Sequence, residues 1–132
     1  MKVIKEIIVF GLVGALGFMI DAAVLYLLKS SLGLYLGRAI SFFCAVIVTW
    51  ILNRSLTFKG EKRKRRLVFE FMHYMVLMLI GGLFNVGTYY LMVHQSELVK
   101  IYPIIGVAAG SIIGMFVNFS TSRLMFYAKT AR

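Results

Sequence analysis

Residues 7–28 read IIVFGLVGALGFMIDAAVLYLL. Only one side chain in this stretch, that of Asp21, carries a charge. About 20 consecutive apolar residues suffice for an α-helix to cross the hydrocarbon core of a bilayer. Lipid offers the backbone no hydrogen-bond partners, so a spanning segment of this kind must be helical. The stretch therefore predicts a transmembrane helix.

Three further apolar stretches repeat this pattern, at residues 34–52, 67–93 and 101–119 or somewhat beyond, with the only proline, Pro103, in the opening turn of the last. Over the whole chain, 61% of the 132 residues are hydrophobic and 15% are charged. A soluble chain of this length could not bury so much apolar surface. The sequence predicts an all-α integral membrane protein with four transmembrane helices in a single domain, residues 1–132.

The positive charges indicate the orientation of these helices. Twelve of the 15 Lys and Arg residues fall on one side of the predicted helices, and the other side has Lys29, Arg38 and Lys100. The positive-inside rule then places both termini in the cytoplasm, together with a basic loop at 59–66. Membrane topology accounts for the net charge of +10, so we expect no nucleic-acid partner.

The second half of the chain repeats the first. A shift of 69 residues superposes two ladders of small or polar residues spaced four apart. The ladders are Gly37, Ser41, Ala45, Thr49 and Asn53 in one half and Gly106, Gly110, Gly114, Asn118 and Ser122 in the other. An offset of 68 places Gly14 on Gly82. We predict two parallel helical-hairpin repeats, residues 6–58 and 67–127, whose helices pack closely through Gly14 and the small ladder residues.

Asp21 is the most costly residue of the predicted spans, because a carboxylate in hydrocarbon needs a partner. Arg38 lies at a similar depth on the next helix, so an ion pair between the two is feasible. Intramembrane carboxylates also mark transport paths, so Asp21 could instead carry a proton or contact a polar cargo. The sequence leaves both interpretations open.

Arg54 and Arg123 are related by the repeat and end the second and fourth spans. Two guanidinium groups at one depth could bind a phosphate bidentately, although both arginines could also be cytoplasmic anchors. Other polar side chains could contact sugar hydroxyls or link helices. These candidates are Asp21, Arg38, Thr49, Asn53, Asn85 and Asn118.

The sequence gives no indication of an enzyme. Cys44 is the only cysteine. His73 and His94 are far apart in the sequence and lack the nearby acidic or thiol side chains that a metal motif requires. No catalytic residue, metal site or cofactor is therefore expected. Glu70 and His73, at the start of the third span, are interpreted as a solvated pair at headgroup level.

Several motifs carry a family resemblance. They are Phe10-x-x-Val13-Gly14 with Asp21 seven residues later, Ala39-x-Ser41-Phe42, Asn53-Arg54-Ser55-Leu56-Thr57-Phe58, and the weaker Asn118-Phe119-x-x-Ser122-Arg123 with Tyr127. Over nearly its whole length the chain resembles the GtrA-like family of small bacterial membrane proteins. Two positions differ from the family pattern, because Thr49 and Ser122 stand where asparagine is usual.

The resemblance implies a flippase that moves an undecaprenyl-phosphate-linked sugar to the outer leaflet of the bacterial cytoplasmic membrane. A membrane glycosyltransferase would then use the sugar for cell-surface polysaccharide. Two alternatives stay open, a non-transporting scaffold for such a glycosyltransferase and a small proton-coupled exporter. Four helices enclose little room for a polar cargo, so we also expect a homo-oligomer, a dimer or a tetramer.

Overall fold

The computed structural model of the chain describes residues 1–59, 66–102 and 104–128, and it leaves out the side chains of residues 34 and 35. Most of the basic loop predicted at 59–66 thus lies outside the described residues, and so does Pro103. Lys59 and Arg66 are the described ends of that loop.

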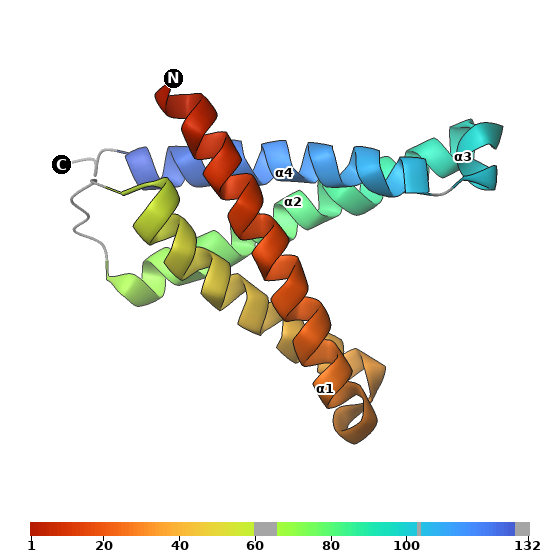
Figure 1. The fold of residues 1–132 in the computed structure, drawn as a ribbon, viewed down its shortest axis with the longest axis horizontal. Coiled ribbons are helices and arrows are strands. Elements are labelled where there is room, and N and C mark those ends of the chain that lie inside the picture. Colours follow the sequence, from red (N-terminus) through yellow and green to blue (C-terminus); the bar gives the residue numbers. More distant parts are fainter. Residues whose placement is uncertain (60–65, 103, 129–132) are drawn as a thin grey trace. The chain divides into compact units, whose positions relative to one another are not determined.

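The described chain is helical, in the order α1 (Lys2–Leu52), η1 (Asn53–Thr57), α2 (Leu67–Gln95), α3 (Glu97–Ile101) and α4 (Ile104–Tyr127) (Figure 1). Within the described residues, four helices are long and apolar enough to cross a membrane. They are Lys2–Gly33, Leu36–Thr57, Leu67–Gln95 and Ile104–Tyr127. The predicted all-α membrane architecture is confirmed. Each helix extends beyond its purely apolar stretch at one end or both.

Gly33 creates the first hairpin by interrupting α1. Its φ of 79° and ψ of 175° lie in a region that only glycine adopts without strain. The chain doubles back there, at the orange end of α1 in Figure 1. Close to the turn, a Cβ atom at Gly37 would lie 3.6 Å from the backbone nitrogen of Lys29, so the two helices approach closely. The turn residue and the small residue after it together make the hairpin tight.

The second helix ends in a π-helix, η1, which the sequence did not predict. The backbone N–H of Phe58 donates to the carbonyl oxygen of Asn53 at 2.9 Å, a bond across five residues. The Thr57 hydroxyl donates to the Asn53 side-chain oxygen at 2.8 Å, and both residues are buried. Single π-helical turns are rare and often mark functional sites.

The short helix α3 occupies a segment expected to be a loop. Its N-terminus is capped by Ser96, whose hydroxyl accepts a hydrogen bond from the backbone N–H of Val99 at 3.4 Å. Ile101, predicted to begin the fourth span, instead ends α3, and α4 begins at Ile104. The prediction failed because Ser96-Glu97 is a capping signal within an otherwise apolar region.

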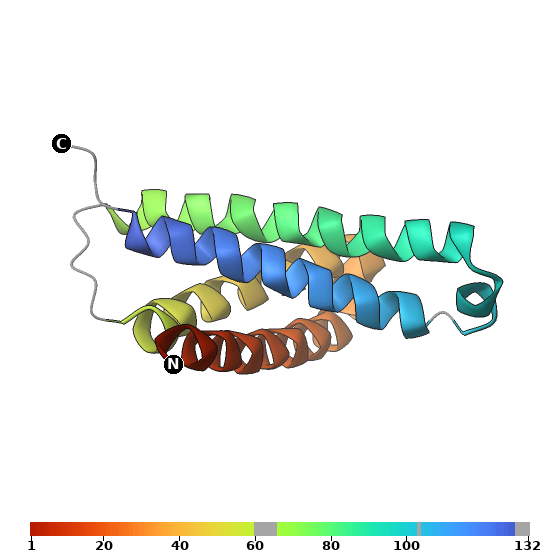
Figure 2. The ribbon, with the colours of Figure 1, turned by 90° about the horizontal axis from the view of Figure 1, so that it is seen from above.

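The contacts divide the described chain into two compact units, with a boundary after Phe71. The first unit contains the α1 hairpin, η1 and the first turn of α2. The second contains the rest of α2 together with α3 and α4, and within it α2 and α4 run side by side in opposite directions (Figure 2).

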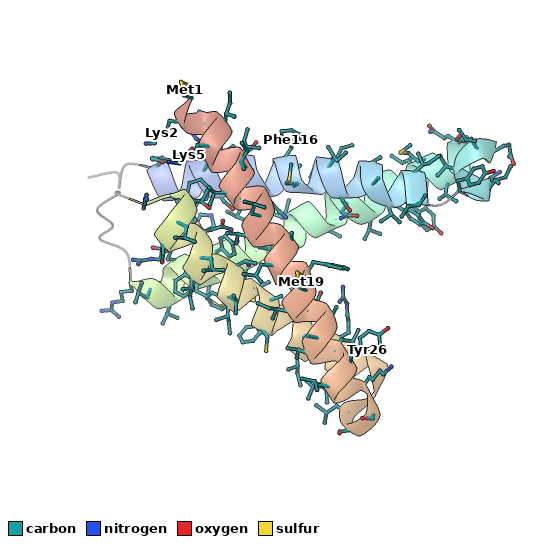
Figure 3. All side chains as sticks on the ribbon, in the orientation of Figure 1. Met1, Lys2, Lys5, Met19, Tyr26 and Phe116 are labelled. Carbon is teal, nitrogen blue, oxygen red and sulfur yellow. The ribbon has the colours of Figure 1, made fainter. Side chains whose placement is uncertain are left out.

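Many large apolar side chains are exposed while several polar ones are buried, which is unusual for a soluble protein. Met19, Tyr26 and Phe116, labelled in Figure 3, are 64%, 68% and 49% exposed. The buried polar residues are Glu6, Asp21, Ser41, Asn53, Thr57, Glu70 and Ser122. Helices that face lipid expose apolar side chains and keep their polar ones inside.

Replacing Gly33 by alanine should destabilise the protein by about 1–3 kcal/mol, since no side chain blocks the site and the cost comes from backbone strain alone. The matched control is Gly14→Ala, at a helical position that also has open space, where alanine should be neutral or stabilising by up to about 1 kcal/mol. Thermal unfolding in detergent measures both. Equal stability of the two variants would contradict the role of Gly33.

Candidate functional site

The end of the first hairpin holds an arginine cluster, which consists of Trp50, Arg54 and Glu70. Arg54 Nε donates to Glu70 Oε1 at 2.9 Å, and Trp50 Nε1 donates to the same oxygen at 3.1 Å. The Glu70 side chain is 3% exposed and that of Arg54 is 37% exposed. One buried carboxylate oxygen thus receives two N–H donors from one helix.

Helical spacing and aromatic packing build this cluster. Trp50 and Arg54 are four residues apart and so share a face of the second helix. Phe71 packs edge-on against Trp50 and Phe43, with ring centroids 5.3 and 5.7 Å apart. These contacts hold the first turn of α2 against the hairpin and place the adjacent Glu70 within hydrogen-bonding distance of Arg54. Because the pair is buried on the Glu70 side, loss of Arg54 would leave an uncompensated carboxylate.

The sequence interpretation of Glu70 as a solvated headgroup-level residue is wrong, because Glu70 is buried and ion-paired. A signal was present in the sequence. Glu6 and Phe10 precede Glu70 and Tyr74 by 64 residues, and all four are buried. The second glutamate therefore repeats a buried position of the first helix.

A second polar group, the aspartate cluster of Asp21, Arg38 and Ser41, lies near the turn of the hairpin. Arg38 Nη1 and the Ser41 hydroxyl each donate to the Asp21 carboxylate at 2.6 Å, one to each oxygen. Asp21 is buried, whereas the Arg38 side chain is 58% exposed. The ion pair considered from the sequence is present, and Ser41, predicted as a packing residue, is its third member.

The two hairpins make equivalent contacts. In the first, Gly17 lies against the Thr49 side chain, and in the second Gly81 lies against that of Asn118. Asp21 contacts Ser41 in the first hairpin, and Asn85 contacts Gly110 at the equivalent place in the second. The second and fourth helices thus match at the predicted offset of 69.

The first and third helices match at an offset of 64 rather than 68. Gly17 and Gly81, like Asp21 and Asn85, are 64 residues apart. Gly14 and Gly82, which an offset of 68 superposes, both face open space. The packing role predicted for Gly14 is therefore not found, and the error is close to one helical turn. A pattern of small residues alone could not distinguish the two registers.

In the second unit the glycine ladder packs against Asn85. A Cβ at Gly110 would lie 2.5 Å from the Asn85 carbonyl oxygen, and one at Gly114 would lie 3.0 Å from the Asn85 Cβ. Gly106 similarly accommodates Tyr89 and Val99. These glycines allow α2 and α4 to approach each other closely.

Two buried polar atoms on α4 have no hydrogen-bond partner among the described residues, Asn118 Oδ1 and Ser122 Oγ. They lie one helical turn apart. Their equivalents in the first hairpin are satisfied, since Thr49 donates to the Val46 carbonyl oxygen and Asn53 accepts from Thr57. Phe126 stands at the position equivalent to Thr57, so the second hairpin lacks that donor.

Arg123 and Asn53 are the remaining predicted site residues, and they lie in different units. Arg123 belongs to the second unit, and its guanidinium lies over the Tyr127 ring at 5.0 Å from the centroid. The Asn53 oxygen is occupied by Thr57 within η1. In the described ranges, no three His, Cys, Asp or Glu side chains group in a way that could hold a metal ion.

A family model for the GtrA/DPMS transmembrane domain matches residues 9–127. The chain belongs to this family. No match is found among curated proteins or among solved structures. The GtrA/DPMS match covers both hairpins, and hence both polar clusters.

Two of the sequence motifs that resemble GtrA-like proteins, the one beginning at Phe10 and the one at Asn53–Phe58, meet at the η1 end of the first hairpin. Phe10 and Phe58 have ring centroids 6.1 Å apart, and both are buried. Asn53 and Thr57 of the same motif bond to each other, and Arg54 pairs with Glu70. In this GtrA/DPMS chain, the Asn-Arg-x-x-Thr-Phe motif therefore closes the hairpin and positions one arginine.

Gly110→Ala should destabilise the protein by about 1–3 kcal/mol, because the new methyl group meets the Asn85 backbone, which cannot move aside. Gly81→Ala should cost less, since the atoms it meets are the end of the Asn118 side chain, which can turn. Gly82→Ala, in open space, is the control and should be neutral or slightly stabilising. Unfolding in detergent gives the order, and a Gly110 variant as stable as the Gly82 variant would contradict the packing.

Proposed function

We propose that this protein is a flippase that moves an undecaprenyl-phosphate-linked sugar from the cytoplasmic to the outer leaflet of a bacterial cytoplasmic membrane. The sugar would serve a membrane glycosyltransferase that modifies cell-surface polysaccharide. The match to the GtrA/DPMS transmembrane domain over residues 9–127 carries the proposal. The arginine cluster supplies a place for the lipid phosphate.

Arg54 is suited to bind that phosphate. Its Nε is fixed by Glu70, so the side chain is held in one orientation before any ligand arrives. The two Nη atoms are free of protein acceptors within the described residues and belong to a partly exposed side chain. A planar pair of N–H donors matches two phosphate oxygens. Arg123, its repeat equivalent, is proposed as the second phosphate contact.

The charge pattern supports a cytoplasmic location for Arg54. Arg54 lies near the end of the second span, Leu36–Thr57, five residues before Lys59 and the basic loop. Anionic headgroups concentrate on that side of the membrane, and the basic residues attract them. A lipid phosphate would therefore reach Arg54 from the leaflet where the lipid-linked sugar is made.

The sugar contacts are proposed for the polar residues of the second unit. Asn118 Oδ1 and Ser122 Oγ are buried atoms that still lack a partner, and a buried polar atom gains most from one. Sugar hydroxyls donate and accept hydrogen bonds and would suit both atoms. Asn85, one helix away within the same unit, adds a further amide.

The aspartate cluster argues for the flippase over a proton-coupled exporter. Both carboxylate oxygens of Asp21 already accept short hydrogen bonds, one of them from an arginine. Because these donors come from the neighbouring helix, the carboxylate joins two helices and offers no free oxygen to a cargo. The scaffold alternative makes no use of Arg54. The proposed homo-oligomer, a dimer or tetramer, would provide the room that four helices lack.

Purified protein in liposomes should move a polyprenyl-phosphate-hexose between leaflets, and Arg54→Ala should slow this at least about tenfold, because a charge-assisted phosphate contact contributes about 1.5–3 kcal/mol. Lys5→Ala is the control, since it removes an exposed cation outside the cluster and should leave the rate unchanged. An enzyme that modifies only outer-leaflet lipid reports the rate.

Two outcomes would contradict the proposal. Wild-type protein that moves no lipid but co-purifies with a glycosyltransferase would favour the scaffold. Undiminished transport by an Arg54→Ala, Arg123→Ala double variant would remove both arginines from phosphate binding.

A further inference from the structure

Glu70 changes the charge that a ligand meets at Arg54. Its carboxylate lies 2.9 Å from the guanidinium and is almost entirely shielded from solvent. A site that only had to attract phosphate would leave the arginine uncompensated. Here the buried Glu70 carboxylate lies directly against the partly exposed Arg54 guanidinium.

The geometry also determines which part of the guanidinium remains available. Arg54 Nε is occupied by Glu70 Oε1, and Trp50 Nε1 holds the same oxygen. A phosphate must therefore approach from the Nη atoms, on the side away from Glu70. At that position it interacts with Arg54 and is repelled, at longer range, by the carboxylate.

We propose that Glu70 is a specificity-determining residue that makes the arginine cluster select a singly charged phosphodiester over a more highly charged phosphomonoester. This inference rests on the flippase function proposed above. A polyprenyl-phosphate-sugar is a phosphodiester with one negative charge. The free polyprenyl phosphate left after sugar transfer is a phosphomonoester with a charge of about −1.5 to −2 near pH 7.

The preference for a phosphodiester follows from the closeness of Glu70 to Arg54 and from the weak screening of the buried Glu70 charge. Glu70 already balances the charge of Arg54, so a ligand meets directional N–H donors without an excess of positive charge. Every negative charge on the ligand is repelled by the Glu70 carboxylate, and a second charge on the phosphate adds to this repulsion without adding a donor. That repulsion persists because a buried charge is weakly screened. Lys59 and Arg66 are exposed, and salt screens their attraction within about 8–10 Å.

This preference would account for the presence of Glu70, whose burial costs free energy. A buried carboxylate-arginine pair contributes little net stability compared with apolar residues of similar size. A cargo that loses its sugar gains charge, and the proposed site would then bind it less well. The loaded lipid would thus compete effectively against the spent carrier in the same membrane.

The test is a competition experiment in liposomes. Transport of a labelled polyprenyl-phosphate-hexose is measured against unlabelled substrate or against free polyprenyl phosphate. In wild type, the free phosphate should inhibit on the order of tenfold less well than unlabelled substrate. Glu70→Gln keeps an oxygen acceptor for Arg54 and Trp50 but removes the charge, and it should bring the two competitors to within about twofold.

The control variant is Glu97→Gln, which makes the same chemical change in an 83% exposed residue paired with Lys100. Its competition ratio should equal that of wild type. A second arm uses wild-type protein alone, so it does not depend on the folding of a variant. The methyl ester of polyprenyl phosphate carries one charge and should compete about as well as the substrate.

The outcomes separate this inference from the function on which it rests. Transport by wild type with an unchanged competition ratio in Glu70→Gln would overturn the selectivity role and leave the flippase intact. Equal competition by free phosphate and its methyl ester in wild type would do the same. Absence of transport by wild type would overturn both proposals.

Discussion

The structure depends on one constraint, that hydrocarbon offers no partner to a polar group. Each acidic side chain buried within a helix must therefore find its partner inside the protein, where removal of that partner is costly. Asp21 is held by Arg38 and Ser41, and Glu70 by Arg54 and Trp50. These two clusters tie the helices of the first unit together near opposite ends of the α1 hairpin.

The clusters differ in what remains available to a ligand. In the aspartate cluster, both carboxylate oxygens accept hydrogen bonds from Arg38 and Ser41 on the neighbouring helix, so the cluster links two helices. In the arginine cluster the carboxylate is hidden and part of the guanidinium is exposed. The η1 turn and the Phe10–Phe58 contact fix the helix end that carries Arg54. In the proposed function, this fixed and partly exposed arginine is the group that binds the lipid phosphate.

The sequence predicted the features that depend on composition and period. Long apolar stretches gave the spans, and the high cost of Asp21 pointed to Arg38. The sequence did not predict the features that depend on the register between helices or on local backbone geometry. Shifting one repeat against the other by one helical turn leaves the stripe of small residues almost unchanged. The sequence therefore pointed to Gly14, whereas Gly17 is the glycine that packs against Thr49. The prediction that Glu70 is solvated failed because burial of Glu70 accompanies the packing of its neighbour Phe71 against Phe43 and Trp50 of α1. Such a contact between distant segments leaves no pattern in the sequence around Glu70. The π-helix at Asn53 likewise depends on a side-chain bond to Thr57.

In the proposed site, a lipid phosphate meets an arginine already held by a buried glutamate. An experimental structure in lipid nanodiscs with a polyprenyl-phosphate-hexose tests it directly. Phosphate density should lie within hydrogen-bonding distance of the Arg54 Nη atoms, with the Glu70 carboxylate still bonded to Nε. Phosphate bound away from Arg54, or a Glu70 side chain turned into water, would contradict the account.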